Sequence, residues 1–174
     1  TFWLNNKFRP VKLGSHKDGA SGTQSTILYK AISESALVLS QQLTEQFSQK
    51  FIVDLLHHHR QLPADNAFAI LSSLELNKEE QSRRQLTKPE LAELYAYAER
   101  HRSFEDSLSV ISKFMLNCFT DGSIAILERQ SALLIVMRVF QAQDIKTCVQ
   151  KLKLDGKKEL AKMIKGSTLK LLGN

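Results

Sequence analysis

Apolar residues recur at intervals of three and four positions from residue 27 to residue 164. This spacing places apolar side chains on one face of an α-helix. Residues 27–56 therefore predict one long helix or two helices in line. The helix is expected to end near His59, because Pro63 disfavours a helical residue before it. Residues 64–74 predict a short second helix.

Capping residues mark where the later helices are expected to begin. The clearest start is the capping box Thr87-Lys88-Pro89-Glu90, whose first and last side chains bond each other's backbone N–H groups. Similar polar residues precede the other stretches: Asn77, Ser103, Ser123 and Asp144. They predict helices over about residues 78–84, 87–101, 104–118, 124–140 and 145–152. A helix over 157–165 closed by Gly166, and a final turn at 168–172, complete the chain.

The stretch 124–140 is the most apolar of these predicted helices. Its apolar residues cover almost every face, which is typical of a helix surrounded by others. We therefore expect it to be the central helix, with Leu127, Leu134 and Val136 among the most buried side chains.

The pattern as a whole predicts an all-α fold. About eight helices would form an orthogonal bundle or a short αα-superhelix, with an extended N-terminal segment. Seven glycines and three prolines are too few for an all-β protein with many tight turns. No apolar run reaches the roughly 18 residues that would suggest a membrane span.

Residues 1–22 show neither helical nor alternating spacing. The Gly- and Ser-rich residues 14–22 predict a flexible linker. Large aromatic side chains are unfavourable in water, so we expect the preceding residues to dock either on the body of the protein or on a partner, and we favour a docking segment for a partner. Its partner-binding residues are Phe2, Trp3, Phe8 and Arg9. Residues 23–174 are then predicted to form a single helical domain with a Lys-rich C-terminal end.

Positive charge is concentrated at the two ends of the chain. Residues 146–174 hold eight lysines and two acids, a local charge of +6 that equals the net charge of the whole protein. Residues 1–22 hold four basic residues and one acid, whereas residues 23–145 hold twelve basic residues and fifteen acids. This distribution suggests that the protein lies against an anionic surface.

The C-terminal lysines form the main candidate binding surface. On the helix over 157–165 they fall largely opposite the apolar residues Leu160, Ala161 and Ile164. A solvated helix face is the simpler interpretation. The alternative is a surface for an anionic partner made of Lys151, Lys153, Lys157, Lys158, Lys162 and Lys165. Lysine without arginine suits a phosphate backbone or an acidic protein, and is poor at reading bases.

The sequence offers little that predicts catalysis or a bound cofactor. His57, His58 and His59 are consecutive, so on a helix they point about 100° apart and cannot converge on one metal ion. The carboxylate pairs fall at helix starts or solvent faces, where capping explains them. No nucleophile elbow, phosphate loop or dinucleotide fingerprint is present. We therefore predict no catalytic residues, no cofactor and no metal.

Two further features bear on the setting of the protein. Cys118 and Cys148 lie in apolar helical contexts, which favours free thiols in an intracellular, reducing compartment. The basic group Arg100-His101-Arg102 is interpreted as solvated charge at a helix end.

One segment resembles a known family. The positions from Phe140 through Asp144, Val149 and Gly156 to Ile164 are similar to part of the smallest helical subunit of the actin-nucleating Arp complex. The resemblance implies helical packing within an assembly.

These observations lead to a functional hypothesis with one alternative. The protein is predicted to be a non-catalytic helical interaction or scaffold domain, not an enzyme. It would act within a larger complex, binding other proteins through its basic, partly apolar ends. The alternative is a nucleic-acid-binding protein, for RNA or a nucleoprotein, that uses the C-terminal lysines. The sequence does not indicate an oligomeric state.

Overall fold

The computed structural model describes residues 2–75, 78–99 and 102–173, without the side chains of residues 78–80. Its N-terminal elements are α1 (Phe2–Asn5), β1 (Arg9–Lys17), β2 (Gln24–Tyr29), α2 (Glu34–Leu56) and α3 (Ala64–Leu71). Next come α4 (Lys78–Arg83), α5 (Lys88–Glu99), α6 (Phe104–Thr120) and the 3-10 turn η1 (Ser123–Ile126). The chain ends with α7 (Arg129–Ile135), the π-helical segment η2 (Val136–Phe140), α8 (Ile145–Leu152) and α9 (Lys157–Leu172). The predicted all-α fold is confirmed, since the described elements are helices apart from one two-stranded sheet.

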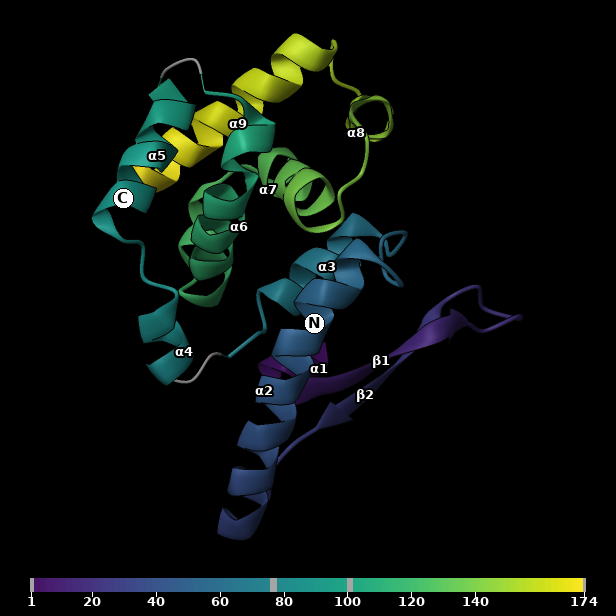
Figure 1. Ribbon diagram of the computed structural model, residues 1–174. Coiled ribbons are helices and arrows are strands. Elements are labelled where there is room, and N and C mark those ends of the chain that lie inside the picture. The colour runs from purple at the N-terminus through teal and green to yellow at the C-terminus, as the bar shows by residue number, and fades with distance from the viewer. Residues whose placement is uncertain (1, 76–77, 100–101, 174) are drawn as a thin grey trace.

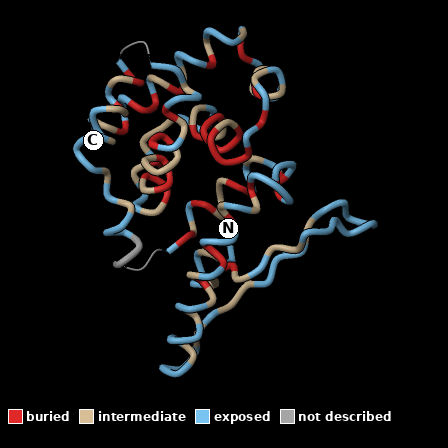
Figure 2. The backbone as a smooth tube through the Cα atoms, in the orientation of Figure 1, coloured by how far each residue is buried: buried red, intermediate tan, exposed pale blue. Residues whose placement is uncertain are grey.

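The C-terminal half forms a bundle in which α9 packs against α5, α7 and α8 (Figure 1). Buried residues gather in this bundle, whereas the hairpin and the beginning of α2 are mostly exposed (Figure 2). The capping box is present as predicted, with the N–H of Thr87 donating to Glu90 Oε2 over 2.7 Å. The side chains of Ser103 and Asp144 also cap their helices. Asn77 lies outside the described residues.

The predicted central helix is interrupted. Leu134 and Val136 are fully buried, as expected, but Leu127 is only partly buried. Leu127 and Glu128 have extended backbones between η1 and α7, so Leu127 lies outside any helix. From Arg129 the chain is continuously helical through α7 and η2. The central helix is therefore residues 129–140; in the turn before it Ile124 is buried, whereas Leu127 is only partly buried.

Residues 24–29 form a strand and not the predicted start of a helix. β2 pairs antiparallel with β1, with Leu28 opposite Pro10 and Ile27 opposite Lys12. Thr26, Ile27 and Tyr29 are β-branched or aromatic, which suits a strand. A two-stranded hairpin is marginal by itself, and here β1 also packs on α2. Because this pairing is non-local, the local apolar spacing did not indicate it.

Residues 14–17 of the predicted Gly/Ser linker belong to β1, and residues 18–22 lie in the turn at the tip of this hairpin. The carboxylate of Asp18 accepts hydrogen bonds from the N–H groups of Ala20 and Ser21, and these bonds lower its pKa. Gly22 has a positive φ of 65°, which glycine adopts without strain. The hairpin spans residue 22, whereas the proposed division of the chain into two units at that residue stays a prediction.

The helix α9 runs through Gly166 and does not end there. The hydroxyls of Ser167 and Thr168 donate to the carbonyls of Met163 and Ile164, and Leu171 is buried in the bundle. Burial of the last turn explains why a glycine fails to end the helix. The predicted helix and the predicted final turn are therefore one element of 16 residues.

Buried glutamines connect the N-terminal elements to the bundle. Gln141 Nε2 donates to the carbonyl of Leu62 over 2.8 Å, and Gln143 Nε2 donates to that of Arg60 over 3.2 Å. Both glutamines are at least 96% buried, with exposed fractions of 0% and 4%. They satisfy backbone carbonyls that the turn before α3 leaves without helical partners. No helix among the described residues is long and apolar enough to cross a membrane.

Candidate nucleic-acid interface

The six lysines predicted to bind an anionic partner, here called the lysine face, come from two adjacent helices. Four of them are on α9, which buries Leu160 and Ile164 against the bundle. Lys158 and Lys162 are exposed and point away from that buried stripe. Lys157 and Lys165 lie nearer to the stripe and line a pocket beside it.

The remaining two lysines lie at the end of α8, which packs against α9. Lys151 Nζ donates to Gln143 Oε1 over 3.2 Å, so its position is fixed by the buried glutamine. Lys153 ends α8 in the left-handed conformation, with φ of 53°, and its side chain is exposed. The structure therefore places Lys151, Lys153, Lys157 and Lys158 around the turn that links α8 and α9, whereas Lys162 and Lys165 lie further along α9.

The pocket beside the lysine face, here called the α9 pocket, has a volume of about 210 Å³. Side chains from α5, α6, η2, α8 and α9 contribute to it. Four of its residues are cationic and one is acidic: Arg102, Arg138, Lys157, Lys165 and Glu105. Its aromatic residues are Tyr97 and Phe104. The pocket thus continues the positive charge of the lysine face inward.

Arg138 is the central cation of the α9 pocket. Its side chain is only 13% exposed, and its guanidinium carbon lies 5.0 Å from the centre of the Phe104 ring. One terminal nitrogen donates to the carbonyl of Gln143, and the other lies 4.0 Å from Glu105 Oε1. Nε is buried and has no hydrogen-bond partner among the described residues.

Tyr97 forms another wall of the α9 pocket. It is 2% exposed, and Lys165 Nζ lies 5.3 Å from the centre of its ring. Burial raises the pKa of the Tyr97 hydroxyl, and the nearby Glu105 carboxylate adds to the shift. The hydroxyl therefore stays protonated at neutral pH.

Sequence reasoning missed the arginines and aromatic residues of this pocket. Arg138 was not singled out, and Arg102 was interpreted as solvated charge at a helix end. Arg102 in fact lies 3.0 Å from Glu93, in an ion pair that orients its guanidinium. The single charged residue inside the apolar run from Ala132 to Phe140 was the signal that could have identified the site.

The predicted N-terminal partner-binding residues lie elsewhere. Trp3 makes edge-to-face contacts with both Phe2 and Phe8, with ring centres 5.3 and 5.1 Å apart. Phe2 and Trp3 remain 68% and 53% exposed. Arg9 forms an ion pair with Glu75 over 2.6 Å. These residues lie near α1 and α2, well away from α9 (Figure 1).

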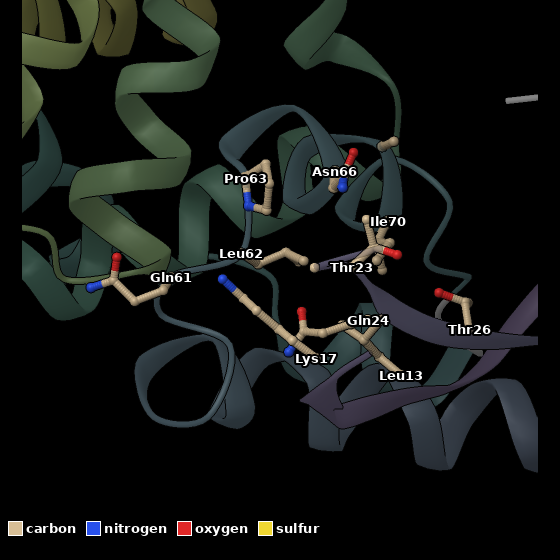
Figure 3. Close-up of a pocket in the computed structure, with 12 residues that line it drawn as sticks. Leu13, Lys17, Thr23, Gln24, Thr26, Gln61, Leu62, Pro63, Asn66 and Ile70 are labelled. Carbon is tan, nitrogen blue, oxygen red and sulfur yellow. The ribbon is translucent and has the colours of Figure 1, made fainter. Parts of the chain in front are cut away.

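A second pocket, of about 290 Å³, lies between the hairpin and the turn before α3. Its wall includes Leu13 and Lys17 from the hairpin, with Leu62 and Pro63 from the turn (Figure 3). Lys17 is the single charged residue in this lining. The pocket therefore lacks the concentration of cations found beside α9.

The other candidates for chemistry have structural roles. His59 is buried and its Nδ1 lies 3.0 Å from Gln24 Nε2, whereas His57 and His58 are exposed. Burial lowers the pKa of His59. Lys113 Nζ donates to both oxygens of Glu90. In the part of the chain that the structure describes, no three His, Cys, Asp or Glu side chains gather as metal ligands.

Comparison with known proteins gives two significant similarities, and no family profile matches the chain. Over 153 residues, 88% of its length, the chain is 27% identical to tRNA(Met) cytidine acetyltransferase TmcA of Thermofilum pendens. Over 173 residues, 99% of its length, it is 30% identical to tRNA(Met) cytidine acetyltransferase TmcA of Vibrio cholerae. It spans 19% and 22% of these two proteins, about a fifth of each.

These similarities correct two predictions made from the sequence. The prediction of a non-catalytic scaffold domain, and the prediction that the protein is not an enzyme, are wrong because both similar proteins are named as enzymes. The sequence misled because it shows no catalytic motif, and the chain corresponds to only a fifth of each relative. The alternative hypothesis of nucleic-acid binding agrees better with proteins named for tRNA.

Proposed function

We propose that this chain is the RNA-binding part of a protein that acetylates cytidine in tRNA. The observation that carries the proposal is the lysine face, on a chain that resembles tRNA acetyltransferases over 88% and 99% of its length. Lysines on a short helix and its neighbour contact phosphates as point charges. Such contacts position an RNA without reading its bases.

The chain's own part in the reaction is to bind and orient the tRNA. Lys153 and Lys158 are exposed around the turn between α8 and α9, and Lys162 is exposed further along α9, so the three can approach a phosphate backbone together. Holding a tRNA in a fixed orientation accelerates a reaction by removing the entropy cost of alignment.

The N-terminal aromatic group supports a second contact, with protein. Phe2 and Trp3 are large and more than half exposed, and exposed aromatic side chains are frequent anchors of protein interfaces. We propose that Phe2, Trp3, Phe8 and Arg9 dock on another protein surface of the larger assembly. Free, buried Cys118 and Cys148 support an intracellular, reducing compartment.

A salt titration of tRNA binding tests the RNA-binding proposal. The logarithm of the association constant should fall linearly with the logarithm of salt concentration, by about 0.7–0.9 per phosphate contact. The triple variant Lys153→Gln, Lys158→Gln, Lys162→Gln should fold normally, because exposed charges add little stability. It should lower the slope by about two to three units.

The matched control is the triple variant Lys12→Gln, Lys17→Gln, Lys50→Gln, which removes the same charge from exposed positions on β1 and α2. It should change the affinity and the slope much less. If the two triple variants weakened tRNA binding equally, the lysine face would contribute only through the net charge of the protein and would not be a binding surface. Absence of tRNA binding near physiological salt would exclude the proposed function.

A further inference from the structure

The first turns of α2 expose a group of apolar side chains. Leu37, Val38 and Leu39 are 52%, 59% and 47% exposed, and Ile32, in the segment that links β2 to α2, is 91% exposed. We call these four residues the α2 apolar surface. It lies at the free end of α2, away from the C-terminal bundle (Figure 1). Isolated exposed apolar residues are common, whereas a contiguous group of them is typical of an interaction site.

The apolar side chains of this turn point in every direction from the helix axis. Residues 36–39 are Ala-Leu-Val-Leu, and consecutive residues of an α-helix point about 100° apart. A helix that is apolar on all sides is typically buried on all sides. Later turns of α2 are covered on one face by the rest of the chain, through Phe47, Phe51 and Leu55. The first turns have the sequence of a buried helix without the cover.

Local packing does not explain these residues. Ser33 caps α2, with its side chain accepting from the N–H of Ala36. Ile32 and Leu37 thus occupy the two positions that can close a hydrophobic staple around a helix start. The high exposure of both side chains shows that such a staple buries little of either. The hairpin packs on α2 through β1, and it also leaves the α2 apolar surface open.

The charge of this segment indicates which kind of partner it fits. No charged residue lies between Glu34 and Glu45. RNA binding depends on cations that neutralise phosphates, so this surface is not suited to RNA. Because it holds no charge, it can be removed from water at little cost. An apolar protein surface is therefore the matching partner.

The shape of the α2 apolar surface favours a groove over a second copy of the chain. Two helices that pack together bury one stripe of each, so a paired copy of α2 would leave other sides of residues 36–39 in water. A groove built from several elements can cover more than one side. The chain spans only about a fifth of each of the two similar proteins, so proteins of that kind have ample further residues to form a groove.

We propose that the α2 apolar surface packs in an apolar groove formed by another part of the same, longer protein. This inference rests on the proposed function, in which the chain is one part of such a protein. The contact would hold the N-terminal elements of the chain against the remainder of the protein. Because the buried Gln141 and Gln143 connect those elements to the bundle, it would also orient the lysine face.

Thiol labelling of Val38→Cys tests the proposal. Cys118 and Cys148 are buried, so a maleimide should react fast only at position 38 when this chain is studied alone. In the full-length protein, mass spectrometry of the same peptide should show labelling at least about tenfold slower, because the surface must first open. The matched control is Ala92→Cys, at an exposed position of α5, which should react equally fast in both forms. Equal rates at position 38 in both forms would overturn the proposal.

Hydrogen exchange supplies a second test. Val38→Lys should speed amide exchange over residues 34–43 of the full-length protein, since lysine is costly to bury in an apolar groove. In this chain alone it should change that exchange little, because the side chain is exposed. Val53→Lys, at a position of the same helix that is also more than half exposed, is the matched control. The proposal fails if the two substitutions have the same effect in the full-length protein.

The concentration of the chain distinguishes a second copy from the proposed groove. If labelling of Val38→Cys in this chain alone slowed as its concentration rose, the surface would bind another copy and the proposal would be wrong. The salt titration of tRNA binding tests the proposed function separately. Fast labelling of the full-length protein together with tRNA binding would reject only the groove. Slow labelling without any tRNA binding would reject the RNA-binding function and leave the groove in place.

Discussion

Arg138 shows at the scale of a single residue how a cation is accommodated in an apolar environment. It lies in η2 between buried Met137 and Val139, and only 13% of its side chain is exposed. A desolvated charge is costly unless hydrogen bonds and neighbouring charges compensate it. Here the carbonyl of Gln143 and the ring of Phe104 provide part of that compensation. Nε remains without a hydrogen-bond partner among the described residues.

Leu134 should be among the residues that stability depends on most. It is fully buried in α7, so Leu134→Ala should lower the free energy of unfolding by about 2–5 kcal/mol through lost burial and a cavity. Urea unfolding followed by circular dichroism measures the change. Leu169→Ala, at a position that is 38% exposed on α9, is the control and should cost less than about 1 kcal/mol. If Leu134→Ala lowered the free energy of unfolding by less than about 1 kcal/mol, the assigned core would be contradicted.

Glu90 should make stability depend on pH. Hydrogen bonds from Lys113, and then from Thr87, lower the pKa of Glu90 from 4.5 to about 2. Because the folded pKa is below the unfolded one, this stabilisation is present above about pH 4.5 and is lost as the pH falls toward 2. Between about pH 4.5 and pH 2, the melting temperature of the Glu90→Gln variant should therefore fall less than that of the wild-type protein. Glu99→Gln, at an exposed position of the same helix, should follow the wild-type curve.

At the scale of elements, local signals decided the starts of α5, α6 and α8, and tertiary contacts decided the end of α9. The capping box of α5 and the serine and aspartate caps of α6 and α8 depend on residues within one turn of each other. The run of α9 past Gly166 depends instead on the burial of Thr168 and Leu171 against distant residues. The hairpin likewise depends on the pairing of β1 with β2 and on packing against α2.

The position of Gly166 inside α9 leads to a stability prediction. Its φ is not positive, and a Cβ built there meets no described atom within 4 Å. Gly166→Ala should therefore raise the free energy of unfolding by about 0.5–1 kcal/mol, since alanine loses less backbone entropy in a helix. Gly122→Ala is the control with the opposite expected sign. Gly122 has φ of +84°, which alanine adopts only with strain, so this substitution should lower the free energy of unfolding. Thermal melts of both variants test this prediction. If Gly166→Ala were less stable than wild type, α9 would have to be broken at residue 166.

At the scale of the whole molecule, the two basic ends of the chain are separated in space. The lysine face lies around α8 and α9, while the N-terminal aromatic residues lie beside α1 and α2 (Figure 1). In the described part of the chain the two basic ends therefore do not adjoin. This separation is consistent with different partners at the two ends, and it makes the paired triple variants a clean comparison.

The sequence by itself determined the helical class and the caps at Thr87, Ser103 and Asp144, whereas the six lysines of the candidate interface stay a prediction. These follow from apolar spacing, from residues within one turn, and from charge that remains on the surface in any packing. It indicated RNA only as an alternative, because lysines suit any anionic surface.

Only the tertiary structure decided which distant residues meet. Tyr97, Phe104, Arg138 and Lys157 lie on four elements, and no spacing along the chain predicts that they share a pocket. The strand at residues 24–29 and the buried Gln141 and Gln143 were hidden for the same reason. These features are stabilised by pairing and burial between residues that are far apart in the sequence, so local patterns along the chain do not predict them.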